Sequence, residues 1–490
     1  MQNYSDSQGL NLKKLVFQNT SAMLFARIVG LFFSLFASIF LVRYLGNERF
    51  GRYSSLYAYI SLFSWLTTLG MDQVLIKEAS QSEGRARQII STGMISAVCL
   101  SVAAVIVAMA SAPFLGYLGN LWLLLLFAVA DLLLLAPLRL ASVAFTINLK
   151  QWQNAIIFIG RQLLWCVAIG LFVLFRVNLS VVILGRFACS FLEALFIFLF
   201  ARRLIFFRWQ WDKVLARDIF QKSFPLALSG LGICIYMRVD QVLLHAWTGD
   251  KELGYYAASV NVAELFTIFV TALTTTMLPV LSRVSLDLER FERYFSLSFR
   301  YLMPFIFGVC ALLTVNSALL IKIFYGKGYA SSAPVLSVLI WSEVGGYFGT
   351  IISIGLIAKG LQKYIPVTTL LGALLNLVLN CLFIPKWGVM GAAWATVLSY
   401  NFSSIVLFFV FSRTRNFAFT GLKASLLPFA AALLLVAVLY STPGIVYNGL
   451  VIILYISILF IFKYWNKNDL RLITEILFKS NKLNEKLQPA

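Results

Sequence analysis

The chain has 490 residues, of which 60% are hydrophobic and only 12% are charged. A soluble globular protein carries about a quarter charged residues, so this composition excludes a soluble fold and predicts a polytopic membrane protein. The net charge of +20 would suit nucleic acid only if the basic residues shared one soluble face, and here they lie mostly in short loops between apolar segments. We therefore expect the lipid bilayer as a partner and no nucleic acid.

Apolar segments long enough to cross a membrane follow one another along almost the whole chain. About 20 residues of helix span the hydrocarbon core, and only helices or closed barrels satisfy the backbone there. The segments are too long for barrel strands, so the sequence predicts an all-α protein. About fourteen transmembrane helices are expected, over approximately 18–42, 53–76, 89–111, 118–138, 154–175, 179–201, 222–246, 254–279, 298–320, 333–358, 364–384, 389–411, 422–440 and 445–464.

Most Lys and Arg residues fall in loops on the same side of these spans as the N-terminus. Basic loops stay in the cytoplasm, so both termini are predicted to be cytoplasmic. The longest loop on that side, "RRLIFFRWQWDKVLARDIFQK" at 202–222, mixes basic and aromatic residues. We expect it to lie as an amphipathic helix at the lipid headgroups.

Two loop segments resemble each other and indicate an internal repeat. "LGNERFGRYSS" at 45–55 aligns with "TGDKELGYYAA" at 248–258. Both are followed by polar residues on one helix face, namely Ser61, Ser64, Thr68 and Asp72 in the first copy and Glu264, Thr267, Thr271 and Thr275 in the second. An even number of spans separates the copies, so the repeat is parallel. It predicts an N-lobe over 1–201, the amphipathic linker over 202–222, a C-lobe over 223–412, two further spans within 413–465 and a cytoplasmic tail over 466–490.

Four stretches carry a resemblance to a known family. They are "SFPLALSGLGICIYMRVDQVLLHAWTGDKELGYYAASVNVAELF" at 223–266, "RYLGNERFGRYSSLYAYISLF" at 43–63, "LGMDQVLIKEAS" at 69–80 and "GVMGAAWATVLSY" at 388–400. Over about 10–412 the chain resembles Wzx-type polysaccharide flippases of the multidrug/oligosaccharidyl-lipid/polysaccharide (MOP) exporter superfamily. Asp240 and Gly254 match well-kept positions of that pattern.

The resemblance implies a MATE/MurJ-like architecture of two six-helix lobes around a central cavity. It also implies alternating access on undecaprenyl-pyrophosphate-linked oligosaccharide units in a bacterial inner membrane, for O-antigen, capsule or exopolysaccharide biosynthesis. A polysaccharide polymerase and a chain-length regulator are then expected partners. The resemblance leaves open whether transport is coupled to H⁺ or Na⁺.

Charged residues inside the predicted spans are the candidate site, because buried charges in a membrane face a cavity or one another. Arginine suits a pyrophosphate, since its planar fork donates two hydrogen bonds and keeps its charge in a dry site. We predict substrate contacts from Arg27, Arg161, Arg186, Arg238 and Glu343, and coupling or gating by Asp72, Asp240 and Glu264.

Structural roles compete with these functions. Arg238 and Asp240 are two residues apart on a helix and do not face each other, so Arg238 needs a partner such as Glu264 or Glu343. Arg186 and Glu193 could bridge through a neighbouring helix. Asp131 could form a hydrogen bond between helices and not contact the substrate. Asp72 lies near the end of its span, where it could face the membrane interface.

Two other classes of function remain as alternatives. A cation-coupled multidrug exporter of the same superfamily would favour carboxylates in the cavity. A polymerase or ligase would need a large outer loop with catalytic Arg or His, whereas the outer loops are short and His245 is the single histidine. No nucleotide-binding or metalloprotease motif occurs, and the six cysteines are scattered singly. We expect a transporter with no cofactor and no metal.

Overall fold

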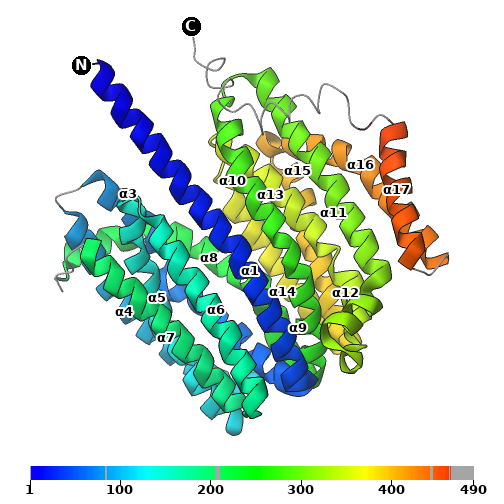
Figure 1. The fold of residues 1–490 in the computed structure, drawn as a ribbon, viewed down its shortest axis with the longest axis horizontal. Helices are drawn as coiled ribbons and strands as arrows, with labels where there is room; N and C mark the ends of the chain where they lie inside the picture. The colour runs from blue at the N-terminus through cyan, green and yellow to red at the C-terminus, as the bar shows by residue number, and fades with distance from the viewer. Residues whose placement is uncertain (1, 83–84, 205–209, 442–444, 463, 465–490) are drawn as a thin grey trace. The chain divides into compact units, whose positions relative to one another are not determined.

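The computed structural model describes residues 2–82, 85–204, 210–441, 445–462 and 464, without the side chains of some helical stretches such as 2–18 and 445–451. This described part is helical, with turns and short irregular connections between the helices (Figure 1). The α-helices are α1 Gln2–Ser61, α2 Ser64–Thr68, α3 Met71–Gln81, α4 Ala86–Ser111, α5 Asn120–Ile147, α6 Gln151–Phe175, α7 Leu179–Leu204, α8 Lys213–Thr248, α9 Asp250–Ala263, α10 Thr267–Arg283, α11 Leu288–Tyr325, α12 Ser332–Leu339, α13 Ser342–Ala358, α14 Tyr364–Asn401, α15 Leu407–Val410, α16 Ser412–Ser441 and α17 Ile445–Ile461. Short turns of tighter or wider helix connect some of them, at Ala112–Leu115, Glu264–Phe266, Lys327–Tyr329 and Phe402–Val406.

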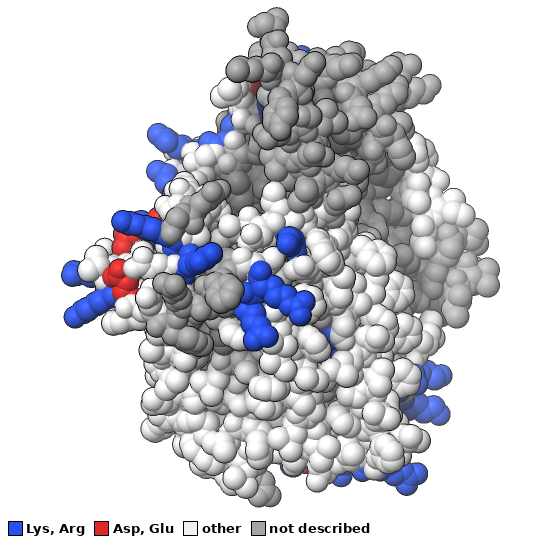
Figure 2. Space-filling model, turned by 60° about the vertical axis from the view of Figure 1, so that its left-hand side comes forward, with Lys and Arg blue, Asp and Glu red and all other residues white. Residues whose placement is uncertain are grey.

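The all-α, multi-pass architecture predicted from the sequence is confirmed. Among the described residues, ten helical segments are long and apolar enough to cross a membrane. Large apolar side chains are exposed along whole helix faces, as at Phe32, Phe36 and Phe40 of α1. Figure 2 shows a face on which uncharged side chains predominate. Such a surface is suited to lipid, because a soluble monomer rarely exposes apolar patches of this extent.

Some of these ten segments differ in length from the predicted spans. Ser21–Gln81 and Tyr364–Val410 each cover two predicted spans, and each contains a backbone break at a glycine with positive φ, Gly46 (φ 69°) and Gly388 (φ 55°). The predicted span over 254–279 is formed by α9, the turn after it and α10. The number of fourteen crossings stays a prediction.

The chain divides into two compact units. Unit 1 comprises the described residues within 1–268, 321–335 and 369–399, and unit 2 comprises the described residues within 269–320, 336–368 and 400–464. In unit 1, α1 packs on α6 and α9, while α5 packs between α4 and α7 (Figure 1). The predicted lobes at 1–201 and 223–412 cut the chain elsewhere and stay a prediction.

Unit 2 is held by aromatic packing and by side chains that satisfy helix carbonyls. Phe295 stacks edge-on against Phe299 and Phe417, with ring centroids 5.3 and 5.2 Å apart. Tyr455 of α17 donates to the carbonyl of Pro304 in α11 at 2.8 Å. Such side-chain bonds help to satisfy helix carbonyls in lipid.

The linker predicted over 202–222 includes the segment between α7 and α8. Residues 205–209 lie outside the described residues, and 213–222 form the first turns of α8 and not a separate helix. Asp212 caps this helix, since its carboxylate accepts from the backbone N–H groups of Val214 at 2.8 Å and Leu215 at 3.1 Å. The predicted tail over 466–490 lies outside the described residues.

The two repeat segments, 45–55 and 248–258, share one backbone shape and pack against each other; we call this contact the repeat junction. Gly46 (φ 69°, ψ 172°) and its counterpart Gly249 (φ 87°, ψ 175°) adopt the same left-handed conformation. A Cβ on Gly51 would lie 1.7 Å from the carbonyl oxygen of Asp250, and a Cβ on Gly254 would lie 2.0 Å from that of Asn47. These contacts are equivalent under the repeat, which supports its parallel arrangement.

The polar side chains of the repeat junction also form two pairs whose positions correspond to each other in the repeat. Arg52 donates from Nε to Asp250 Oδ2 at 2.8 Å, and Asn47 donates to the hydroxyl of Tyr255 at 2.8 Å. His245 Nδ1 lies 2.8 Å from the other oxygen of Asp250. Burial alone would raise the pKa of Asp250, but its hydrogen bonds with His245 and Arg52 outweigh burial and lower that pKa.

Candidate substrate cavity

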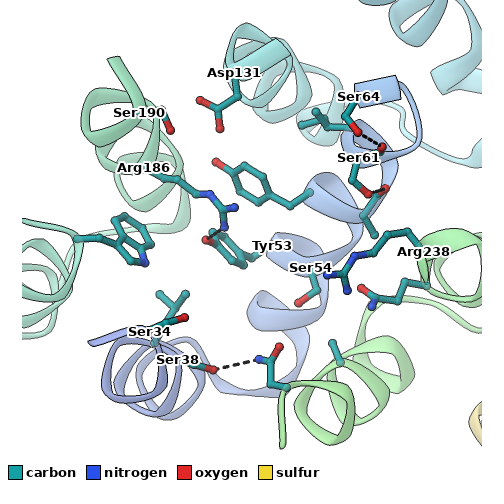
Figure 3. Close-up of a pocket in the computed structure, with 18 of the residues that line it drawn as sticks. Ser34, Ser38, Tyr53, Ser54, Ser61, Ser64, Asp131, Arg186, Ser190 and Arg238 are labelled. Carbon is teal, nitrogen blue, oxygen red and sulfur yellow. Dashed lines mark hydrogen bonds between the residues drawn. The ribbon is translucent and has the colours of Figure 1, made fainter. Parts of the chain in front are cut away.

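A cavity of about 500 Å³ opens within unit 1, among α1, α2, α5, α6, α7, α8 and α9. This volume lies in the range of sites that hold small ligands. Its lining contains four arginines, two carboxylates, several hydroxyls and four aromatic rings (Figure 3). The charged and aromatic members are Arg139, Arg161, Arg186, Arg238, Asp131, Glu193, Phe50, Tyr53, Tyr57 and Trp165. Positive charge therefore exceeds negative charge at this wall.

Serines of α1 and α2 provide one side of the cavity. Ser34 and Ser38 lie one turn apart before the break at Gly46, and Ser54, Ser61 and Ser64 follow it on one helical face. The break allows both parts of the helix to face the same space. Ser38 accepts a hydrogen bond from Asn261 of α9 at 3.0 Å, which Figure 3 draws as a dashed line.

The polar stripe predicted after the first repeat segment is only partly in this wall. Ser61 and Ser64 line the cavity, whereas Thr68 is buried and Asp72, in the first turn of α3, is not among the lining residues. In the second copy, the side chains of Thr271 and Thr275 lie outside the described ones. The polar helix face that was predicted after Glu264 in the second copy therefore stays a prediction.

Arg186 lies between aromatic rings of α1 (Figure 3). Its guanidinium donates to the hydroxyl of Tyr53 and lies 3.7 Å from the ring centroid of Tyr57, a cation–π geometry. Asp131 of α5 is 7% exposed, interacts electrostatically with Arg186, and one of its carboxylate oxygens has no hydrogen-bond partner among the described residues. Aromatic rings therefore hold the guanidinium in place without fully occupying its donors.

Two further predicted arginines line the cavity, and each is paired with a carboxylate. Arg161 Nε lies 3.2 Å from Glu193 of α7, and Arg238 Nη1 lies 3.3 Å from Glu264. Arg161 of α6 is thus the partner of Glu193, and among the described residues no ion pair joins Glu193 to Arg186. Of the two partners considered for Arg238, the structure brings Glu264 to it.

Asp240 faces different surroundings from Arg238, as two positions on one helix must. It is 4% exposed, accepts from the hydroxyl of Tyr256, and accepts from the backbone N–H of Gln241 at 2.7 Å. Tyr256 in turn lies 3.2 Å from the hydroxyl of Thr396 in α14. Asp240 therefore ties α8 to α9, while Arg238 lines the cavity.

Two further predicted site residues lie elsewhere. Arg27 is exposed on α1, and Glu343 is in the first turn of α13 in unit 2. Neither is among the residues that line this cavity. Their proposed contact with substrate stays a prediction.

Several cavity residues are not among those predicted from the sequence. The predicted span ends at 138, which leaves Arg139 in a loop, but α5 continues to Ile147 and carries Arg139 into the wall. Tyr53, Tyr57 and Trp165 carry little signal as single residues, because aromatic side chains also occur in lipid-facing helices. The spacing of Tyr53 and Tyr57, one helical turn apart, was the available signal.

Solved structures of membrane transporters share the fold of this chain. The fold is similar to the lipid II flippase MurJ in an inward closed conformation, with a TM-score of 0.71 and 18% identity over 91% of this chain and 99% of that chain. It is also similar to an inward-facing MATE multidrug resistance transporter, with a TM-score of 0.60 and 14% identity over 84% of this chain and 96% of that one.

Residues 40–334 match the model of the family described as "Polysaccharide biosynthesis protein". The chain belongs to this family. Similar proteins include the probable low-salt glycan biosynthesis flippase Agl15 of Haloferax volcanii, 24% identical over 39% of this chain and 41% of that protein. Another is the capsular polysaccharide biosynthesis protein CapF of Staphylococcus aureus, 23% identical over 40% of this chain and 50% of that protein. The chain thus matches half or less of the length of these relatives.

Proposed function

We propose that the protein is a flippase for lipid-linked oligosaccharides. In this proposal it moves undecaprenyl-pyrophosphate-linked repeat units from the cytoplasmic to the outer leaflet of a bacterial inner membrane by alternating access, with both termini in the cytoplasm. The exported units serve O-antigen, capsule or exopolysaccharide biosynthesis. The observation that carries the proposal is the cavity of unit 1, where four arginines face two carboxylates among serines and aromatic rings.

The chemistry of this wall suits both parts of such a headgroup. Guanidinium groups bind phosphate oxygens in pairs and stay charged in a dry site. Serine hydroxyls such as Ser34 and Ser54 can exchange hydrogen bonds with sugar hydroxyls, and Trp165 offers a flat apolar face. Outward movement of each negative charge gains about 2.3 kcal/mol per 100 mV of inside-negative potential, so the membrane potential itself can drive export.

Asp240 has a positioning role in this proposal. Its bonds with Tyr256 and with the backbone of Gln241 fix the turn of α8 that presents Arg238 to the cavity. Coupling to H⁺ or Na⁺ through Asp72, Asp240 or Glu264 is a separate part of the proposal, and a flipping assay with and without each gradient tests it.

A multidrug exporter is the second candidate. The carboxylates Asp131 and Glu193 in the cavity favour it, because they would attract organic cations. The excess of arginine over carboxylate at the same wall opposes cation binding, since unlike charges attract and like charges repel at short range. The flippase is therefore the better supported of the two.

Deletion of the gene tests the proposal. Lipid-linked repeat units are assayed on each membrane face of the deletion strain and of strains that express the wild type or Arg186→Ala at equal levels. We expect repeat units to accumulate on the cytoplasmic face unless the wild type is supplied. Normal appearance of repeat units outside, together with lost resistance to cationic dyes, would replace the flippase by the exporter.

A further inference from the structure

Among the described residues, Arg139 differs from the three other cavity arginines in having no side-chain partner. Arg161 and Arg238 are each paired with a carboxylate, and Arg186 is held by two tyrosines. Arg139 lines the same cavity and its side chain is exposed, yet within the described ranges it makes no ion pair and its guanidinium donates no hydrogen bond. In the part of the chain that the structure describes, Arg139 is therefore the cavity arginine whose charge is not compensated.

The arginines also lie at different depths in unit 1. A helix rises about 1.5 Å per residue, so Arg139 is about 12 Å from the end of α5, and Arg161 is about 15 Å from the start of α6, which follows it. Arg186 is about 27 Å from the corresponding end of α7. Arg238 is about 38 Å from the start of α8. Arg139 is therefore the cavity arginine nearest to the end of unit 1 where α5 meets α6, the end predicted to face the cytoplasm.

We propose that Arg139 is the capture residue of the cavity, the first cation that the phosphate headgroup of a lipid-linked substrate meets. This inference rests on the proposed flippase function and adds the order in which the arginines act. An anion gains the full attraction of Arg139 on approach, whereas at Arg161 or Arg238 it competes with a carboxylate already in place. The headgroup passes from Arg139 to the deeper arginines as it displaces Glu193 from Arg161.

If the headgroup meets Arg139 before Arg186, substitutions of these two arginines should have different kinetic effects. Charges at the rim of a site govern association and its salt dependence, while buried charges govern dissociation. Arg139→Ala should therefore slow association about tenfold at low salt with little change in dissociation. Arg186→Ala should speed dissociation instead, because its guanidinium lies deep in the cavity against Tyr57.

The test uses the full chain in phosphatidylcholine nanodiscs, with undecaprenyl pyrophosphate as the probe and stopped-flow fluorescence as the readout. Association is measured at about 0.1 M and 1 M salt, between which the Debye length falls from about 10 Å to about 3 Å. The tenfold deficit of Arg139→Ala should nearly vanish at high salt, and Arg139→Lys should recover most of the rate. The matched control is Arg202→Ala, an exposed arginine in the last turn of α7 outside the cavity lining.

The possible outcomes distinguish the capture role of Arg139 from the flippase proposal. Binding by the wild type with an unchanged association rate in Arg139→Ala overturns the capture role and leaves the flippase proposal intact. Absence of binding by the wild type overturns both. A second arm adds phosphatidylglycerol or inorganic pyrophosphate as competitors; equal competition by phosphatidylglycerol would make Arg139 a general lipid-phosphate contact and contradict substrate capture.

Discussion

Substitution of Gly254 by alanine should open the repeat junction. The added Cβ would lie 2.0 Å from the carbonyl oxygen of Asn47, and contacts under 3.0 Å are essentially never seen. The two segments must therefore separate by about 1 Å, and forcing an extra methyl into a packed contact typically costs about 1–3 kcal/mol. If the junction is closed only in one state of the transport cycle, this cost shifts the equilibrium toward the open state about 5- to 150-fold.

Cysteine labelling measures that shift. A cysteine replaces Ser54 of the cavity wall in a background without the six native cysteines, and a membrane-impermeant maleimide is added from the outside of intact cells. We expect faster labelling in Gly254→Ala than in the parent. Gly170→Ala on α6 is the control, because a Cβ there meets nothing within 4 Å. Unchanged labelling and unchanged thermal stability in Gly254→Ala would refute the close approach.

Three further predictions concern charged side chains. Arg238→Ala should abolish export of repeat units at normal protein level while Arg238→Lys retains a fraction, and normal export by the alanine variant would leave Arg238 with a purely structural role beside Glu264. Tyr256→Phe should lower the thermal unfolding temperature, since it removes the donor to a buried carboxylate, about 1–3 kcal/mol; no shift would contradict the buried bond. Because the pKa of Asp250 is lowered in the folded protein, its carboxylate stabilises the fold at pH values above its pKa in the unfolded chain. That stabilisation is lost as the pH falls through the pKa of the folded state. The unfolding of Asp250→Asn in detergent should therefore depend less on pH below about 4 than the unfolding of the wild type.

The helical architecture could be predicted because lipid imposes it. An apolar segment of about 20 residues must be helical in a bilayer, and the described residues of the predicted spans are largely helical. Helix ends and breaks were harder to predict. The helix α5 runs on to Ile147 because apolar residues continue past the basic side chain of Arg139, and a basic residue near a span end is equally typical of a loop.

The candidate site could be predicted only in part from single residues. Mid-span arginines stand out in any sequence, and Arg161, Arg186 and Arg238 all line the cavity. Pairing depends on which helices pack together, so the partners of Glu193 and Arg186 required the structure. The glycines of the repeat were visible as a pattern, whereas their mutual contact arises from packing of segments far apart in the chain.

Transfer of a fluorescent undecaprenyl-pyrophosphate-linked oligosaccharide across the bilayer of proteoliposomes tests the central claim most directly. The account predicts transfer by the wild type, acceleration when a potential pulls anions in the transport direction, and at least a tenfold loss in Arg186→Ala, which removes the guanidinium held between Tyr53 and Tyr57. Absence of transfer by the wild type, or an equal rate in Arg186→Ala at equal protein content, would contradict the claim that the arginines of this cavity carry the headgroup.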